Sequence, residues 1–265
     1  MHNFALGVEY DGHAFHGWQR QVGQCSVQQT LEEALSRIAA QPIKVTAAGR
    51  TDTGVHATQQ VVSFATGVDR PERAWVKGTN SLLPNELSVR WVLPVPAQFH
   101  ARFSATGRRY QYVFLEAEPA PAIARHYVTC SPTLLDDAAM HTAAQQLVGE
   151  HDFTSFRSAS CQAKSPFRCV FSIAVRRFAD LVVIDISANA FLQHMVRNIA
   201  GALFHVGRGE REPGWMGQML MARNRELVGA TAPPTGLYLV DVQYGTVELP
   251  RAQPPLILRA LGDVW

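Results

Sequence analysis

The chain has 265 residues, of which 47% are hydrophobic and 17% charged, and its formal net charge at pH 7 is +2. These values exclude a disordered chain and fit a folded enzyme of one large or two ordinary domains, while so mild a charge does not by itself indicate a nucleic-acid partner. No apolar stretch has membrane-spanning length and the N-terminus lacks signal-peptide features, so we expect a cytoplasmic protein with no membrane contact. The four cysteines form no C-x-x-C pair, which argues against a zinc ribbon or a redox motif.

The first hundred residues predict strands alternating with helices. Loose alternation over residues 4–10 predicts a strand, which the turn signal Asp11-Gly12 ends. Ser26, with Gln29 three residues later, matches a capping box and predicts a helix that ends near residues 41–42. The apolar stripe of this helix consists of Val27, Leu31, Leu35 and Ile38. Glu32 and Glu33 lie in its early turns, where the helix dipole favours acidic residues. Further strands are expected over 43–47, 60–64 and 87–93, and a helix from about 69 to 82.

The second part of the chain repeats this mixture of elements. A strand is predicted over 108–115, with Tyr110, Tyr112 and Phe114 on one face. A helix over 136–148 precedes a hairpin of residues 168–178 and 181–187, which turns at Ala179-Asp180, and a long helix over 192–206 follows. A short helix and a strand come last. We expect an α+β fold with a mixed or antiparallel sheet backed by helices, divided into an N-terminal half (1–105), a C-terminal half (106–248) and a tail (249–265).

The loop over residues 49–57, Gly-Arg-Thr-Asp-Thr-Gly-Val-His-Ala, is the first candidate site. It joins two predicted strands, and glycines on either side of Asp52 allow tight backbone angles that hold this side chain out. Arg50 and His56 add ionisable groups close by. The same residues also fit an ordinary turn in which Asp52 bonds backbone N–H groups, and His56 fits an ordinary loop histidine, to which we assign no chemical role.

Five motifs in order along the chain carry a resemblance to a known family. They are GRTDTGVHA at 49–57, RRYQYVF at 108–114, GEHDFTSFR at 149–157, FLQHMVRNIAG at 191–201 and PPTGLYL at 233–239. With these motifs the chain resembles the bacterial TruA-type tRNA pseudouridine synthases from residue 4 to about residue 245. The resemblance implies the pseudouridine synthase fold, in which two similar halves enclose the active-site cleft.

The resemblance also implies an activity and a role for each matched residue. The activity is isomerisation of uridine to pseudouridine at positions 38, 39 and 40 in the anticodon arm of tRNA, by a homodimer that uses no cofactor and no metal. Asp52 falls on the catalytic aspartate, and Tyr110 on the tyrosine that packs against the target base. Arg197 falls on the arginine that pairs with the aspartate, Arg50 on the one that helps displace the flipped nucleotide, and Leu237 on an apolar residue of the pocket.

The reaction gives a physical reason for these residue types. Asp52 has to be ionised to attack C1′ or to remove a ribose proton, and burial beneath uracil would raise its pKa. A paired cation opposes that shift, so we predict that Arg197 lies against Asp52. Basic residues of the hairpin region can follow RNA phosphates or simply form a solvated edge; they are Lys164, Arg168, Arg176 and Arg177.

Two other functions remain open from the sequence. A hydrolase acting on a glycosidic bond would need a second positioned acid, for which Asp152 is the nearest candidate. A binding module that uses Tyr110 and the basic clusters to hold tRNA would leave Asp52 as a turn residue.

Overall fold

The computed structural model describes residues 1–259, and the chain divides into two compact units. The first comprises Met1–Thr106 together with the segment from Tyr238 onwards, and the second comprises Gly107–Leu237. Residues 238–248, which the sequence analysis placed in the C-terminal half, thus belong with the first unit. The reason is a parallel pairing, Tyr238 with His56 and Leu239 with Ala57, between segments far apart in the chain.

The sheet of the first unit is mixed. Its strands follow the order β4 (Leu87–Pro94), β1 (His2–Tyr10), β3 (His56–Thr66) and β10 (Leu237–Tyr244), and the short β2 (Thr46–Ala47) also pairs with β3. β1 is antiparallel to β3 and to β4, whereas β10 runs parallel to β3. The strands predicted over 4–10, 60–64 and 87–93 are confirmed.

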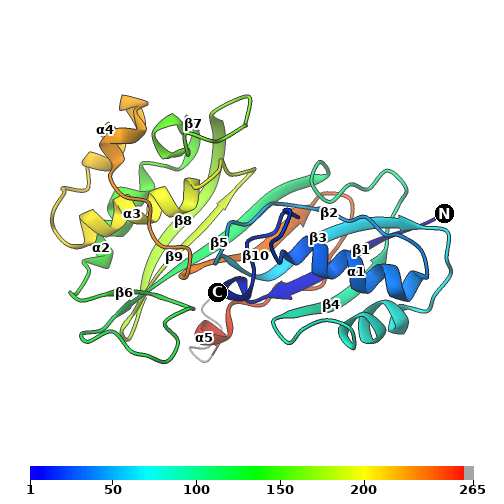
Figure 1. The fold of residues 1–265 in the computed structure, drawn as a ribbon. Coiled ribbons are helices and arrows are strands. Elements are labelled where there is room, and N and C mark those ends of the chain that lie inside the picture. The colour runs from blue at the N-terminus through cyan, green and yellow to red at the C-terminus, as the bar shows by residue number, and fades with distance from the viewer. Residues whose placement is uncertain (260–265) are drawn as a thin grey trace. The chain divides into compact units, whose positions relative to one another are not determined.

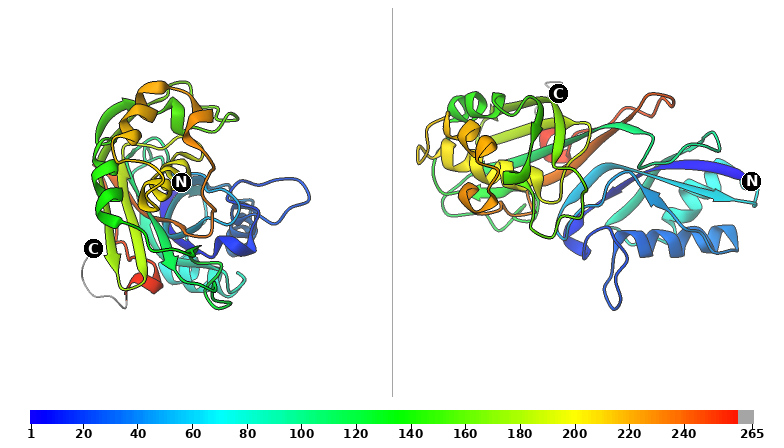
Figure 2. Two further views of the ribbon diagram at one scale, coloured as in Figure 1. Left: turned by 90° about the vertical axis from the view of Figure 1, so that its left-hand side faces the viewer. Right: turned by 90° about the horizontal axis from the view of Figure 1, so that it is seen from above.

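Helix α1 (Val27–Ala39) covers one face of this sheet (Figure 1, Figure 2). The predicted cap is confirmed, because the Ser26 hydroxyl accepts a hydrogen bond from the N–H of Gln29 at 3.4 Å. The helix ends at Ala39, two residues earlier than predicted, because Ala40 after it has a left-handed φ of 51°. A helical segment around η2 (Ala74–Gly78) buries Trp75. The centroid of its ring lies 5.6 Å from that of Phe4 and 5.2 Å from that of Phe64.

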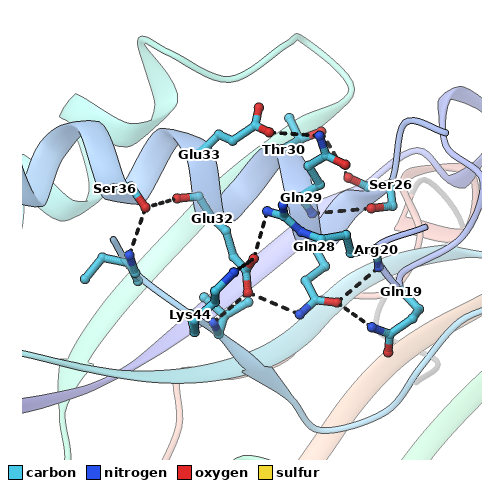
Figure 3. A network of polar contacts seen from close by, with 12 residues as sticks. Gln19, Arg20, Ser26, Gln28, Gln29, Thr30, Glu32, Glu33, Ser36 and Lys44 are labelled. Atoms are coloured by element: carbon cyan, nitrogen blue, oxygen red, sulfur yellow. Dashed lines mark hydrogen bonds and ion pairs between the residues drawn. The ribbon is translucent and has the colours of Figure 1, made fainter. Parts of the chain in front are cut away.

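The strand predicted over 43–47 is only two residues long, because two of its backbone N–H groups donate to side chains of α1 instead of to a neighbouring strand. The N–H of Val45 donates to the Glu32 carboxylate at 3.0 Å, and that of Ile43 to the Ser36 hydroxyl at 2.9 Å. Glu32, in the second turn of the helix, is a buried acceptor in the polar network of Figure 3. Arg20 and Gln28 also donate to its carboxylate, at 3.0 and 3.2 Å.

The second unit is built on antiparallel neighbours in the order β5 (Ala105–Glu116), β9 (Leu181–Ala188), β8 (Phe167–Phe178) and β7 (Gly149–Asp152). The short β6 (Thr129–Ser131) pairs with β5 in parallel. The predicted hairpin is confirmed: Phe178 pairs with Leu181, and Ala179 in the turn has a φ of 49°.

Helices α2 (Asp137–Gln145) and α3 (Met195–Gly207) pack against each other, and α2 packs on β8 (Figure 1). The apolar side predicted for α3 is confirmed, since Met195, Ile199, Leu203 and Val206 are buried. This helix starts at Met195 rather than at residue 192, because His194 has a left-handed φ of 62°. The remaining short elements are η1 (Gly12–Ala14), η3 (Thr154–Phe156), α4 (Trp215–Ala222), η4 (Arg225–Val228) and α5 (Leu256–Arg259).

Together these elements confirm the predicted α+β class with mixed strand pairing. Within residues 1–259, no helix combines the length and the hydropathy that crossing a membrane requires.

Candidate active site

The loop that carries Asp52 joins β2 to β3 and exposes its charged residues to different degrees. Arg50 is exposed, Asp52 is half-buried, and Thr51 between them is buried. The N–H of Val55 donates to the carbonyl oxygen of Asp52 at 3.1 Å, and Gly54 has a φ of 81°. Asp52 therefore does begin a tight turn, as one interpretation of the sequence held. Its backbone carbonyl makes the turn bond, and the residue as a whole is half-buried.

Buried polar side chains of the sheet hold this loop. The Tyr10 hydroxyl lies 2.8 Å from the Thr51 hydroxyl, and the Gln60 amide donates to the carbonyl oxygen of Gly49 at 2.7 Å. Burial raises the pKa of Tyr10 to about 12, against the opposing effect of its hydrogen bonds with Thr51 and Gln60. Tyr10 is thus a neutral hydrogen-bonding partner near pH 7, and it fixes the residue that precedes Asp52.

His56, four residues after Asp52, closes the loop from inside the fold. Its side chain is almost fully buried, and its ring stacks on Tyr238 with 4.8 Å between centroids. The ring nitrogen Nδ1 is 3.1 Å from the N–H of Gly12 and 3.2 Å from a carboxylate oxygen of Asp11. Whether Nδ1 accepts from Gly12 or donates to Asp11 depends on the tautomer, and either bond ties His56 to the same turn. These contacts give His56 a structural role.

In the second unit, Tyr110 lies on β5 opposite Ile186 of β9. Tyr110 is 8% exposed, and its ring meets the ring of Phe191 edge-on, with 5.0 Å between centroids and 81° between planes. The ring is therefore held in one orientation by an aromatic neighbour from the segment before α3.

Arg197 on α3 and Leu237 at the start of β10 border the same loop, residues 229–236. The Arg197 Nε donates to the carbonyl oxygen of Ala232 at 2.8 Å, and the Ala232 N–H donates back to the carbonyl oxygen of Arg197 at 3.2 Å. Leu237 is buried, and its N–H donates to the carbonyl oxygen of Pro234 at 3.0 Å. The first bond ties the guanidinium to this loop, and the second ties the backbone of α3 to it.

Tyr112 is a further residue at this loop, to which the sequence analysis gave no role. It is fully buried, and its hydroxyl donates to the carbonyl oxygen of Pro233 at 2.8 Å and lies 2.6 Å from the hydroxyl of Thr129. Burial raises its pKa well above that of an ordinary tyrosine. The only signal in the sequence is its position two residues after Tyr110, on the same face of the strand.

Asp152 does not have the properties of a second catalytic acid. Burial would raise its pKa, but hydrogen bonds from the hydroxyl and the N–H of Thr154, at 2.6 and 2.9 Å, outweigh that effect, and the nearby Arg223 and Arg157 add to them. The net result is a pKa below the ordinary value. A general acid at neutral pH needs a raised pKa, so this carboxylate gives no support to the glycosidic-hydrolase interpretation.

The basic residues of the hairpin region differ in their surroundings. Arg177 pairs with Glu116 and with Asp137, the latter at 2.9 Å, and is a structural ion-pair residue of the second unit. Arg168 is half-buried and donates to the carbonyl oxygen of Ser165 at 3.0 Å. Lys164 and Arg176 are exposed. Of the four residues named from the sequence, Arg177 thus has the weakest claim to a phosphate contact.

The fold and the two candidate regions define an α+β protein in which a half-buried aspartate stands in a rigidly supported loop. The sequence profile described as tRNA pseudouridine synthase matches residues 7–104 and 143–245. The chain therefore belongs to the tRNA pseudouridine synthase family, whose members are isomerases.

Relatives match this chain over nearly its whole length. It is 54% identical to tRNA pseudouridine synthase A of Pseudoalteromonas atlantica over 256 residues, which cover 96% of this chain and 97% of that protein. Identity to tRNA pseudouridine synthase A of Cronobacter sakazakii is 52% over 260 residues, covering 98% and 96%. Among solved structures, an archaeal box H/ACA Nop10–Cbf5 complex matches 76% of this chain and 43% of that one, at 11% identity and a TM-score of 0.36.

Proposed function

We propose that this protein isomerises uridine to pseudouridine at positions 38, 39 and 40 in the anticodon arm of tRNA, with Asp52 as the catalytic residue. The observation that carries the proposal is the match over 96% of the chain to a relative named tRNA pseudouridine synthase A. The half-buried position of Asp52 in a supported loop agrees with it, because a catalytic carboxylate has to be both held and accessible.

The reaction breaks the bond from N1 of uracil to C1′, turns the base, and joins C5 to C1′, with the proton on C5 lost and one gained at N1. No electron is transferred and no water is consumed. Asp52 serves as an anion, either by attacking C1′ or by removing a ribose proton, and both routes fit a single carboxylate.

The other predicted site residues belong to the proposal with separate roles. Extruding the target nucleotide from its stack costs a few kcal/mol. Tyr110, whose ring Phe191 holds edge-on, receives the base, and the exposed Arg50 occupies the gap left in the RNA. Arg197 pairs with Asp52 and keeps it ionised, and Leu237 contributes apolar surface to the base pocket.

The proposal also includes the setting in which the enzyme works. It acts in the cytoplasm, without a cofactor, as a homodimer that binds tRNA through its basic surface. Binding then weakens as salt increases, because each phosphate contact releases a counterion.

Asp52→Asn tests the catalytic assignment, because the substitution keeps the shape and removes the charge. We expect pseudouridine formation on unmodified tRNA to fall on the order of a thousandfold, with tRNA binding retained. Asp69→Asn, the same change at an exposed site of the first unit, is the control and should leave the rate unchanged. Full activity of Asp52→Asn would refute the assignment, release of free uracil by the wild type would favour a hydrolase, and binding without any product would favour a tRNA-binding module.

Arg197→Ala tests the proposed ion pair in the same assay. We expect turnover to fall while the Kd for tRNA stays nearly constant, because the pair acts on the charge of Asp52 rather than on RNA binding. An unchanged rate would refute the pairing and leave the role of Asp52 intact.

A further inference from the structure

The segment Asp11–Trp18, between β1 and the exposed loop before α1, lies directly against the loop of Asp52. The N–H of Gly54 donates to the carbonyl oxygen of Gly12 at 3.2 Å, and the N–H of Trp18 donates to that of Thr51 at 3.0 Å. These two backbone bonds hold the Asp52 loop on either side of the carboxylate. Asp52 is therefore flanked by residues whose backbones are tied to one neighbouring segment.

The two glycines of this segment make the approach possible. A methyl group on Gly12 would lie 2.1 Å from the carbonyl oxygen of Val55. A methyl group on Gly17 would lie 2.9 Å from the carbonyl oxygen of Thr51 and 3.2 Å from the carbonyl carbon of Asp52, and Gly17 has a φ of 77°. Since the obstructing atoms are backbone atoms, no side-chain movement could relieve these contacts.

Both ends of the segment are anchored to other elements. At its start, Gly12 and Asp11 contact the buried ring of His56, which lies within β3. At its end, the first N–H groups of α1 donate to the segment, Val27 to the carbonyl oxygen of Gly17 at 3.2 Å and Gln28 to that of Trp18 at 3.0 Å. Trp18 is buried. The segment is thus held from both sides. Residues 20–25, which follow it, are exposed and project from the unit in Figure 2.

The polar network of Figure 3 extends this anchoring by two residues. The Gln28 side-chain oxygen accepts from the N–H of Arg20 at 3.1 Å and from the amide of Gln19 at 3.0 Å. Glu32 then accepts from the guanidinium of Arg20. A hydrogen-bonded stretch of chain therefore lies between the exposed loop and the segment that contacts the Asp52 loop.

We infer that the segment Asp11–Trp18 is a positioning element for Asp52, with Gly12 and Gly17 as its points of contact. The inference rests on the proposed function, since it assigns the role of holding the catalytic carboxylate. A misplacement of about 1 Å at a reacting group can cost about a hundredfold in rate. A methyl group added at Gly12 or Gly17 should therefore displace the Asp52 loop and lower turnover, although it removes no group that touches RNA.

Gly12→Ala tests the inference, and Gly67→Ala is its matched control. A methyl group on Gly67 would meet no atom within 4 Å, and Gly67 lies in the same unit. We expect kcat of Gly12→Ala to fall at least about thirtyfold, with KM and the Kd for tRNA within about twofold of the wild type, and Gly67→Ala to match the wild type. An unchanged kcat overturns the inference, as does a loss that appears equally in Kd, which would make the segment an RNA-binding one.

Gly17→Ala makes the same test if Gly12→Ala does not fold, because its closest contact is less severe.

Amide hydrogen exchange over residues 49–57 tests the positioning independently of the proposed function. We expect faster exchange in the Gly12 or Gly17 variant than in the wild type and in Gly67→Ala, and equal exchange overturns the inference. If Asp52→Asn stays active, the catalytic assignment on which the inference rests fails; if Asp52→Asn is inactive while Gly12→Ala keeps full turnover, only the positioning role fails.

Discussion

A single hydroxyl, that of Tyr112, connects three parts of the second unit. It bonds to Thr129 of β6 and to Pro233 of the loop beside Arg197, from a fully buried position. Tyr112→Phe removes this hydroxyl and leaves a buried carbonyl oxygen without that donor, so we expect a loss of about 1–3 kcal/mol in the free energy of unfolding. Urea denaturation measures this loss.

Tyr127→Phe is the matched control, since Tyr127 is 41% exposed and water can replace its contacts. It should change the free energy of unfolding by less than about 0.5 kcal/mol. Equal effects of the two substitutions would show that the buried hydroxyl does not stabilise this loop.

Tyr112 also shows which part of the proposed site can be predicted from a sequence. Asp52, Tyr110 and Arg197 stand in motifs that are recognisable as strings of neighbouring residues. The bond from Tyr112 to Pro233 spans 121 positions along the chain, and the contact of Gly12 with Val55 joins two loops. Such contacts depend on tertiary packing, so the local spacing of residues predicted neither of them.

At the scale of elements, α1 and the strand beside it show where local patterns succeed and where they fail. The start of α1 was predicted because a cap is made by residues three positions apart. The alternation over 43–47 correctly indicated burial of Ile43 and Val45, but burial does not specify a hydrogen-bond partner. Here the partners are side chains of α1, which reduce the paired strand to Thr46–Ala47.

Glu32 is the residue on which this junction of elements depends. It is 2% exposed and accepts from Val45, Arg20 and Gln28. Glu32→Ala leaves the Val45 N–H without its acceptor and separates α1 from the base of the projecting loop, so we expect a loss of about 3 kcal/mol in unfolding free energy. Glu33→Ala changes the adjacent, exposed carboxylate and should cost less than about 0.5 kcal/mol in the same urea titration. A similar loss in both variants would contradict the role of Glu32.

At the scale of the whole molecule, the division into units depends on one strand that local patterns could not assign. β10 follows the second unit in the chain and pairs in parallel with β3 of the first. A pattern of alternating residues predicts that β10 is a strand, but its partner is about 180 positions away, so the sequence-based boundary at residue 248 followed chain order instead.

Each of the two units also buries a tyrosine whose ionisation its fold opposes, Tyr10 in the first and Tyr112 in the second. Burial raises the pKa of both phenols, that of Tyr10 to about 12. Because the folded-state pKa lies above the unfolded value of about 10, the neutral phenols stabilise the fold fully below pH 10. That contribution decreases as the pH rises above 10 and is lost, for Tyr10, as the pH passes through about 12.

An alkaline titration of the whole protein checks this expectation. Phenolate absorbance should rise through pH 10 to 11 for fewer than all six tyrosines, and the rest should ionise only as circular dichroism reports unfolding. Tyr10→Phe and Tyr112→Phe should each remove one tyrosine from the late phase and none from the early one. If all six tyrosines titrate near pH 10 while the circular dichroism spectrum stays native, burial does not raise the pKa of the two phenols. The support that Tyr10 gives to the Asp52 loop then does not depend on a protonated hydroxyl.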